Sequence, residues 1–190
     1  CNLRPINPYG FSKQLFDEWV LRQTDRPQYW LGFKFFNVYG PNEYHKGRMA
    51  SVVFHAFNQI KNTGKIRLFK SHREDFKDGE QMRDFIYVKD VARVLTFCYQ
   101  NRINSGIYNL GTGRARTFYD LALNVVNNTL PSAEIEYFDM PEDLRGKYQY
   151  FTEAKMEKLR SAGYLEEFTS LEDGIADYVN KFLKENYKIF

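Results

Sequence analysis

The chain has 190 residues, of which 43% are hydrophobic and 17% aromatic, so it can bury a core and is not globally disordered. Its 27 basic and 24 acidic residues leave a formal net charge of +3, which is too mild to indicate a nucleic-acid partner. No apolar run approaches the roughly 18 residues of a membrane span, and Cys1 and Cys98 are too few for a disulfide framework. We therefore expect a cytoplasmic protein with no membrane or nucleic-acid partner.

The first half of the chain alternates helical and strand-like patterns. Asn7-Pro8 is typical of a helix start, with an N-cap followed by proline at the first helical position. The apolar run over 29–38 is typical of a strand buried on both faces of a parallel sheet. The elements predicted in this half are helices over 9–23 and 49–62, strands over 29–38 and 65–69, and a polar loop over 71–81.

The second half continues the same alternation. Asp90 is expected to cap a helix in which Val91, Val94, Leu95 and Cys98 repeat at helical spacing, with Cys98 as a small buried hydrophobe. The other elements predicted here are strands over 84–88, 107–110 and 134–138, and helices over 117–128, 152–162 and 171–187. Strands alternating with helices indicate an α/β fold with right-handed crossovers.

Tyr9 and Lys13 stand four residues apart in the first predicted helix, so they share one helix face. An ammonium group beside a phenol stabilises the phenolate and so assists proton transfer. Such a pair is also common on a solvated helix surface, and by itself it favours that ordinary interpretation.

Four segments give this pair a context. They are NPYGFSK over 7–13, FFNVYGP over 35–41, RDFIYV over 83–88 and YNLGTG over 108–113. In this order they resemble the extended short-chain dehydrogenase/reductases of the NAD-dependent epimerase/dehydratase family. The resemblance implies that Tyr9 is the catalytic tyrosine, and that Lys13 is both a catalytic and a cofactor-binding residue. It also implies that the turn ending FFNVYGP lies beside the nicotinamide, beyond the carboxyl end of its strand.

The fold implied is α/β: an incomplete Rossmann-like, doubly wound parallel sheet with a smaller α/β substrate-binding domain. The dinucleotide-binding domain is expected to contribute 1–41 and 84–113. The substrate-binding domain is expected to comprise mainly 42–83 and 114–190. The glycines at 111–113 lack the third glycine of a phosphate-binding fingerprint and are interpreted as strand-end packing. Because that fingerprint is absent and no initiator methionine precedes the first helix, we expect the start of the protein to be missing and these 190 residues alone to be inactive.

Two further segments indicate which subfamily the sequence resembles. EYHKGRMASVVFH over 43–55 and GKYQYFT over 146–152 are similar to the ADP-heptose 6-epimerases, and the similarity extends over essentially the whole chain. It implies that Lys46 is the second catalytic acid/base. It also implies that Lys13, Val38 and Lys46 contact the cofactor, NADP with NAD as the alternative. The residues implied to line the ADP-heptose substrate are Asn37, Arg48, His55, Phe69, Lys70, Ser71, Arg83 and Tyr148.

The reaction implied is inversion at C6 of the heptose in ADP-D-glycero-D-manno-heptose. It proceeds by transient oxidation to a ketone, and the protein would supply heptose for the lipopolysaccharide inner core. Inversion needs an acid/base on each face of the carbonyl, which explains why both Tyr9 and Lys46 are required. The resemblance departs at Arg48, where many members carry serine, so this contact is expected to differ. A homo-oligomer is expected, and His45 and His72 show no metal-ligand spacing with carboxylates, so no metal is proposed.

Ordinary structural roles stay open for several of these residues. Lys46 on a polar loop is also typical of a solvated lysine, and His55 of a half-buried core histidine. Arg83 can equally be the ion-pair partner of a nearby carboxylate, and Tyr148 can serve packing alone. At the level of the whole protein, the alternatives are another nucleotide-sugar epimerase or dehydratase of the superfamily, and a non-catalytic nucleotide-sugar-binding module.

Overall fold

The computed structural model describes residues 5, 7–146 and 148–189. Its helices are α1 (Pro8–Arg22), the 3-10 helix η1 (Tyr44–Met49), α2 (Val52–Thr63), α3 (Val88–Asn101), α4 (Phe118–Thr129), α5 (Glu142–Arg145), α6 (Glu157–Ser161), α7 (Leu171–Tyr178) and the π helix η2 (Val179–Leu183). Its strands are β1 (Leu31–Phe35), β2 (Asn37–Tyr39), β3 (Lys65–Phe69), β4 (Met82–Arg83), β5 (Phe85–Tyr87), β6 (Gly106–Leu110), β7 (Arg116–Thr117) and β8 (Glu134–Phe138).

The strands pair mainly in parallel, which confirms the expected α/β class. β1 pairs with β6, β2 with β5 and β3 with β8, all in parallel, and each pair is joined through intervening helices. The short strands β4 and β7 pair in the antiparallel direction and set Arg83 opposite Arg116. Parallel pairs need such crossover connections, because a tight turn cannot join the end of one strand to the distant start of the next.

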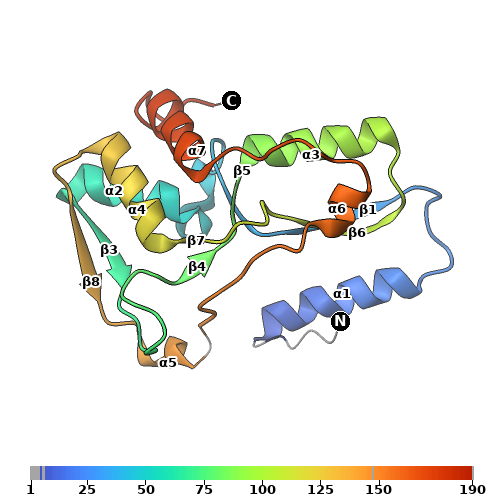
Figure 1. Ribbon diagram of the computed structural model, residues 1–190, viewed down its shortest axis with the longest axis horizontal. Coiled ribbons are helices and arrows are strands. Elements are labelled where there is room, and N and C mark those ends of the chain that lie inside the picture. Colours follow the sequence, from blue (N-terminus) through green and yellow to red (C-terminus); the bar gives the residue numbers. More distant parts are fainter. Residues whose placement is uncertain (1–4, 6, 147, 190) are drawn as a thin grey trace.

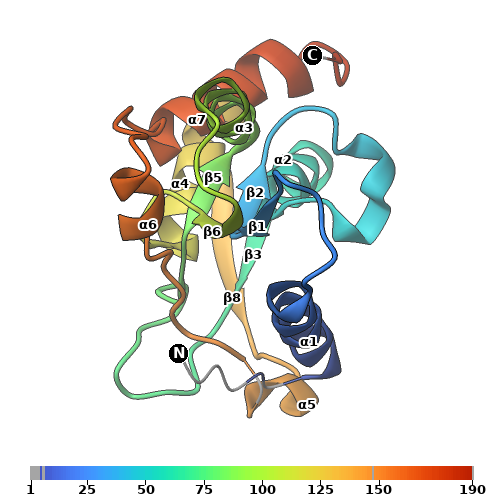
Figure 2. The ribbon, with the colours of Figure 1, turned by 90° about the vertical axis from the view of Figure 1, so that its right-hand side faces the viewer.

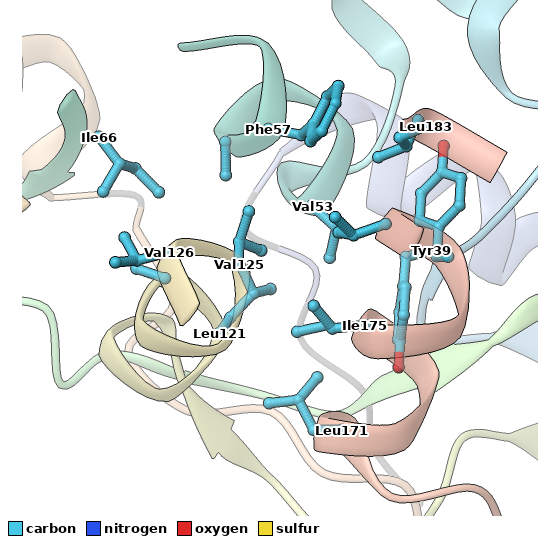
Figure 3. Close-up of a cluster of buried hydrophobic side chains, with 14 of the residues drawn as sticks. Tyr39, Val53, Phe57, Ile66, Leu121, Val125, Val126, Leu171, Ile175 and Leu183 are labelled. Carbon is cyan, nitrogen blue, oxygen red and sulfur yellow. The ribbon is translucent and has the colours of Figure 1, made fainter. Parts of the chain in front are cut away.

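Two hydrophobic clusters hold the fold together. The first lies among α2, α4, α7 and η2 and the strands β3 and β5, and its packing is shown around Val53, Leu121 and Ile175 in Figure 3. The second lies between α3, α6 and the β1–β6 pair, with Val94, Cys98 and Leu110 fully buried. The expected burial of Cys98 is therefore confirmed.

Helix α1 lies on the opposite side of β1 and β6 from α3 (Figures 1 and 2). Asn7 is its N-cap, as expected: its side chain accepts a hydrogen bond from the Gly10 N–H at 2.8 Å. The Lys34 ammonium on β1 pairs with the Asp17 carboxylate and links the helix to the sheet. No residue of α1 is buried, and Trp19 is 59% exposed, so the apolar side chains of this helix face solvent in the described structure.

Several expectations about individual elements were wrong. The strand predicted over 29–38 is split into β1 and β2 at Phe36, and Phe35 is 54% exposed rather than buried. Asp90 is not a helix cap, because α3 begins two residues earlier. Its buried carboxylate instead accepts hydrogen bonds from the backbone N–H and hydroxyl of Thr169, each within 2.8 Å.

The helix predicted over 152–162 is confined to α6, because the residues before it run beside β4. The Thr152 N–H donates to the Met82 carbonyl at 3.2 Å, and the Ala154 N–H donates to Asp84 at 3.0 Å. In the last helix, α7 ends at Tyr178 and continues as the wider turns of η2.

Asp84 joins three segments between the clusters, and its replacement tests this role. Its fully buried carboxyl group accepts the N–H and hydroxyl of Thr112 at 2.7 Å, and the N–H groups of Gly113 and Ala154 at 2.8 and 3.0 Å. In Asp84→Asn an NH2 group replaces one carboxylate oxygen, and this group cannot accept the two hydrogen bonds that the oxygen accepted. We therefore expect the free energy of unfolding to fall by about 2 kcal/mol. Chemical denaturation measures it. Asp25→Asn, at an exposed position after α1, is the control, and equal stability of both variants would contradict the joining role.

Candidate active site

The predicted Tyr9–Lys13 pair lies on one face of the first turns of α1. The Lys13 ammonium is 5.2 Å from the centre of the Tyr9 ring. The Tyr9 side chain is 72% exposed, and Lys13 is exposed beside it. Within the described residues Lys13 forms no ion pair, so its N–H donors are available to a ligand. The pair is therefore presented to solvent as a phenol with an adjacent cation.

Asn37 and Val38 lie on β2, at the turn that follows β1. The Asn37 N–H donates to the Asp84 carbonyl at 3.0 Å, and the Asn37 side chain is exposed. The Val38 N–H donates to the Phe36 carbonyl at 2.9 Å, and Val38 is half-buried opposite Ile86. Gly40 ends this turn at φ 141°, where an added Cβ would lie 2.4 Å from the Val88 side chain, so only glycine fits.

Lys46 and Arg48 lie on η1, immediately after this turn, and both are exposed. Gly47 between them has φ 52° and ψ −126°, a combination that favours glycine and bends the short helix. His55 lies on the following helix α2 and is half-buried, so the structure leaves both interpretations of this histidine open.

Phe69, Lys70 and Ser71 lie at the carboxyl end of β3. The Phe69 ring is 4.8 Å from the Phe138 ring of the paired strand β8 and 5.9 Å from the Tyr148 ring, which it meets edge-on. Lys70 makes a long contact of 3.9 Å with Asp139, and such an exposed pair contributes little energy. The carboxyl end of β3 therefore carries the aromatic ring of Phe69 beside Lys70, a lysine whose ion pair is weak.

Arg83 lies between two aromatic rings. Its guanidinium carbon is 5.1 Å from the centre of the Tyr148 ring and 5.7 Å from that of Phe118. Its Nη1 donates to the Met82 carbonyl at 2.8 Å. Burial lowers the pKa of Arg83 and raises that of Tyr148, although the arginine charge partly offsets the second shift. Arginine remains charged at any physiological pH, and the phenol remains a hydrogen-bond donor.

The Arg83 charge has no counter-ion within the described residues, whereas that of Arg116 opposite it on β7 has two. Arg116 pairs with Asp120 at 3.1 Å and with Glu172 at 2.6 Å. A half-buried cation without a carboxylate is costly unless an anion reaches it. The structure thus argues against the ion-pair alternative for Arg83 and leaves its remaining donors for a ligand such as phosphate.

The structure brings two sets of the predicted residues together. Tyr9 contacts Lys13, and Tyr148 contacts both Phe69 and Arg83. Lys46, Arg48 and His55 lie on η1 and α2, a separate segment that follows the β2 turn. Sequence reasoning missed Phe118. The Thr-x-x-Asp pattern over 117–120 signals a helix start there, but only the β4–β7 pairing places the first residue of α4 against Arg83.

The exposed Lys13 ammonium, which forms no ion pair with any described residue, and the neighbouring Tyr9 phenol are groups of the kind that hydrogen-bond a ribose hydroxyl. The 190 residues contain no Gly-x-x-Gly-x-x-Gly, so this sequence has no such loop for the diphosphate of a dinucleotide.

Among the described residues, no group of three or more His, Cys, Asp or Glu side chains is placed to hold a metal ion. No helix in the described part of the chain is long and apolar enough to span a bilayer.

A parallel α/β fold that carries an exposed Tyr–Lys pair on α1 agrees with the family comparison. The chain belongs to the NAD dependent epimerase/dehydratase family, whose model matches residues 1–111. Rossmann-like epimerases are also its structural neighbours, which confirms the expected fold class. The UDP-glucose 4-epimerase of Thermus thermophilus in complex with NAD superposes with a TM-score of 0.74 at 24% identity, over 93% of this chain and 54% of that one.

More similar relatives share one name. The chain is 55% identical over 187 residues to the ADP-L-glycero-D-manno-heptose-6-epimerase of Fusobacterium nucleatum, a match that covers 95% of this chain and 56% of that protein. The crystal structure of the Helicobacter pylori ADP-L-glycero-D-manno-heptose-6-epimerase superposes with a TM-score of 0.78 at 30% identity, over 95% of this chain and 52% of that one. The chain therefore spans about half the length of the curated relatives it matches.

Proposed function

We propose that the protein is an ADP-heptose 6-epimerase that inverts C6 of the heptose in ADP-D-glycero-D-manno-heptose. The observation that carries this proposal is the 55% identity to a protein of that name over nearly the whole chain. Support comes from the geometry, which presents Tyr9 beside Lys13 and leaves Arg83 without a counter-ion among the described residues. The product would supply heptose to the lipopolysaccharide inner core.

Tyr9 and Lys46 are proposed as the two acid/base groups. When bound, NADP, or NAD in its place, would supply a reversible hydride acceptor for C6. The Tyr9 phenol oxygen exchanges a proton with the C6 hydroxyl on one face of the sugar. The Lys46 amine does so on the other face, because each epimer presents its hydroxyl on a different side. Lys13 holds the ribose of the cofactor and stabilises the phenolate.

The substrate lies, in this proposal, along the carboxyl ends of the strands. Asn37 and His55 contact the sugar, and Val38 contacts the cofactor through its backbone. The end of β3 and the Arg83–Tyr148 pair hold the ADP portion, with Arg83 on the diphosphate. The assignment of 1–41 and 84–113 to the cofactor domain, and of 42–83 and 114–190 mainly to the substrate domain, stays a prediction.

Turnover of the two epimers by the full-length protein with NADP tests the proposal. Nuclear magnetic resonance of the heptose should show ADP-D-glycero-D-manno-heptose converting to an equilibrium mixture of both C6 epimers. Competition binding should favour ADP-heptose over uridine-diphosphate sugars. Preference for a uridine-diphosphate sugar would identify a different nucleotide-sugar enzyme, and tight sugar-nucleotide binding without turnover would identify a binding module.

Arg83→Lys tests the diphosphate contact. A lysine keeps the charge but cannot donate two parallel hydrogen bonds or stack between Phe118 and Tyr148. We therefore expect the affinity for ADP-heptose to fall about tenfold, with NADP affinity unchanged, as measured by calorimetric titration of the full-length protein.

Arg67→Lys is the matched control for this variant. Arg67 is an exposed arginine on β3 whose guanidinium lies 4.3 Å from the Phe138 ring centre, so the same change removes a similar stack. It should leave ADP-heptose affinity unchanged. Equal affinities for Arg83→Lys and the wild type would show that Arg83 serves packing and not the diphosphate.

The partners and location follow from the same proposal. The substrate is an ADP-heptose, the protein forms a homo-oligomer in the cytoplasm, and neither nucleic acid nor a membrane is a partner. The buried free thiol of Cys98 is compatible with a reducing compartment.

A further inference from the structure

One buried carboxylate fastens the loop that carries Lys46. Glu43, at the start of this loop, is only 5% exposed. Its Oε2 accepts the backbone N–H of Ser51 at 2.6 Å. Its Oε1 accepts the Ser51 hydroxyl at 2.6 Å and the Tyr178 hydroxyl at 3.0 Å. Both oxygens are therefore used, by donors from two other parts of the chain.

These hydrogen bonds join the residue before η1 to a residue just after it, so the two ends of η1 are held close together. Glu43 immediately precedes η1, and Ser51 follows it as the N-cap of α2. The Glu43 backbone carbonyl also accepts the Lys46 N–H at 3.0 Å. Lys46 is thus held between two stems at a fixed separation, while its own side chain stays exposed.

Tyr178 connects this loop to the first hydrophobic cluster. It lies on α7 and is fully buried. Burial and the nearby Glu43 charge both raise the pKa of Tyr178, so the hydroxyl remains a donor to the carboxylate at any working pH. The bond therefore ties the exposed loop to a helix near the other end of the sequence.

The arrangement supplies precise placement more than stability. A buried carboxylate loses its hydration, and an apolar side chain of similar size would fill the same space without that loss. Three converging donors compensate for the loss and also fix a single geometry for the loop. Such geometry matters for an acid/base group, whose effectiveness falls steeply with displacement from the reacting atom.

We propose that Glu43 is a positioning residue for Lys46, acting through Ser51 and Tyr178 without touching the substrate. This inference rests on the proposed role of Lys46 as an acid/base in the epimerase. Its consequence is that removal of the carboxylate should impair the chemical step and leave substrate binding almost intact.

The test compares Glu43→Gln and Tyr178→Phe in the full-length protein and in its Lys46→Met variant. In the otherwise unchanged protein, Glu43→Gln should lower kcat about tenfold, and Tyr178→Phe should lower it less, with KM nearly constant. In the Lys46→Met background neither change should lower kcat further, because the group they position is gone. If Glu43→Gln does not fold, Tyr178→Phe carries the same comparison with one bond removed.

Tyr164→Phe is the control for Tyr178→Phe. Tyr164 is also a fully buried tyrosine, but its hydroxyl has no hydrogen-bond partner among the described residues, so kcat should not change. Equal losses in both backgrounds, or an unchanged kcat in Glu43→Gln, would overturn the positioning role and leave the proposed function standing. Full activity of Lys46→Met alone would overturn the acid/base role of Lys46, and the positioning role with it.

Discussion

Replacing Tyr9 by phenylalanine is expected to lower kcat for C6 epimerisation by about 10² or more, the usual loss for a positioned general acid/base. The side chain is 72% exposed at the start of α1, so removal of its hydroxyl leaves no cavity and no buried unpaired group. The Lys13 ammonium lies 5.2 Å from the ring centre and should stay in place. Steady-state turnover of the full-length protein measures the loss.

Binding measurements separate chemistry from folding in this variant. The affinities of Tyr9→Phe for ADP-heptose and NADP should equal those of the unchanged protein. Tyr99→Phe removes the hydroxyl of another exposed tyrosine, on α3, and should leave turnover unchanged. Near-normal turnover in Tyr9→Phe would contradict the acid/base role of Tyr9. The Tyr9–Lys13 pair would then be an ordinary pair of residues on a solvated helix surface.

Replacing Lys46 by methionine is expected to have an effect of similar size. Methionine keeps the length of the side chain but removes the amine, so no group would exchange a proton on the second face of the sugar. Because the two acid/base groups act on different faces, Tyr9 cannot substitute for Lys46. We expect kcat to fall by about 10² or more in both directions of the epimerisation, with substrate binding retained.

Lys77→Met is the matched control for the second variant. Lys77 is an exposed lysine in the loop before β4, and its loss removes the same charge from the protein. If Lys46→Met and Lys77→Met show equal turnover, Lys46 is a solvated lysine, and the second acid/base must be sought elsewhere.

The elements with strong local signals were the ones that the sequence predicted well. Strands β3 and β8 match their predicted ranges, and α4 differs by one residue at each end. Each has a clear apolar pattern and a local start or stop signal, such as the Thr117 capping box. The N-cap at Asn7 is equally local, and it was predicted correctly.

The misses share a different cause. Asp90 resembles a helix cap, but its partner Thr169 lies far along the chain. The segment before α6 was predicted to be helical. It is extended instead, because its backbone N–H groups donate to the Asp84 carboxylate and the Met82 carbonyl. Long-range hydrogen bonds of this kind leave no periodic signal in the sequence.

The contacts of the candidate site are likewise either local in sequence or made between distant segments. Tyr9 and Lys13 share a helix face, so their contact follows from spacing alone. The contact of Arg83 with Tyr148 depends on how two distant segments fold back on each other. The resemblance to known epimerases implied only that both residues line the substrate. Phe118 and Glu43 have ordinary neighbours in sequence, so their contacts became visible only in three dimensions.

In the proposed reaction C6 is inverted by removal and return of one hydride, and isotopic labelling of C6 reports on this hydrogen. ADP-D-glycero-D-manno-heptose carrying deuterium at C6 would be incubated with the full-length protein and NADP in ordinary water. Mass spectrometry and nuclear magnetic resonance would then follow the label in the separated epimers. We expect the L-glycero product to retain the deuterium at C6. Loss of the label to solvent during turnover would contradict it, because the hydrogen would then leave carbon as a proton.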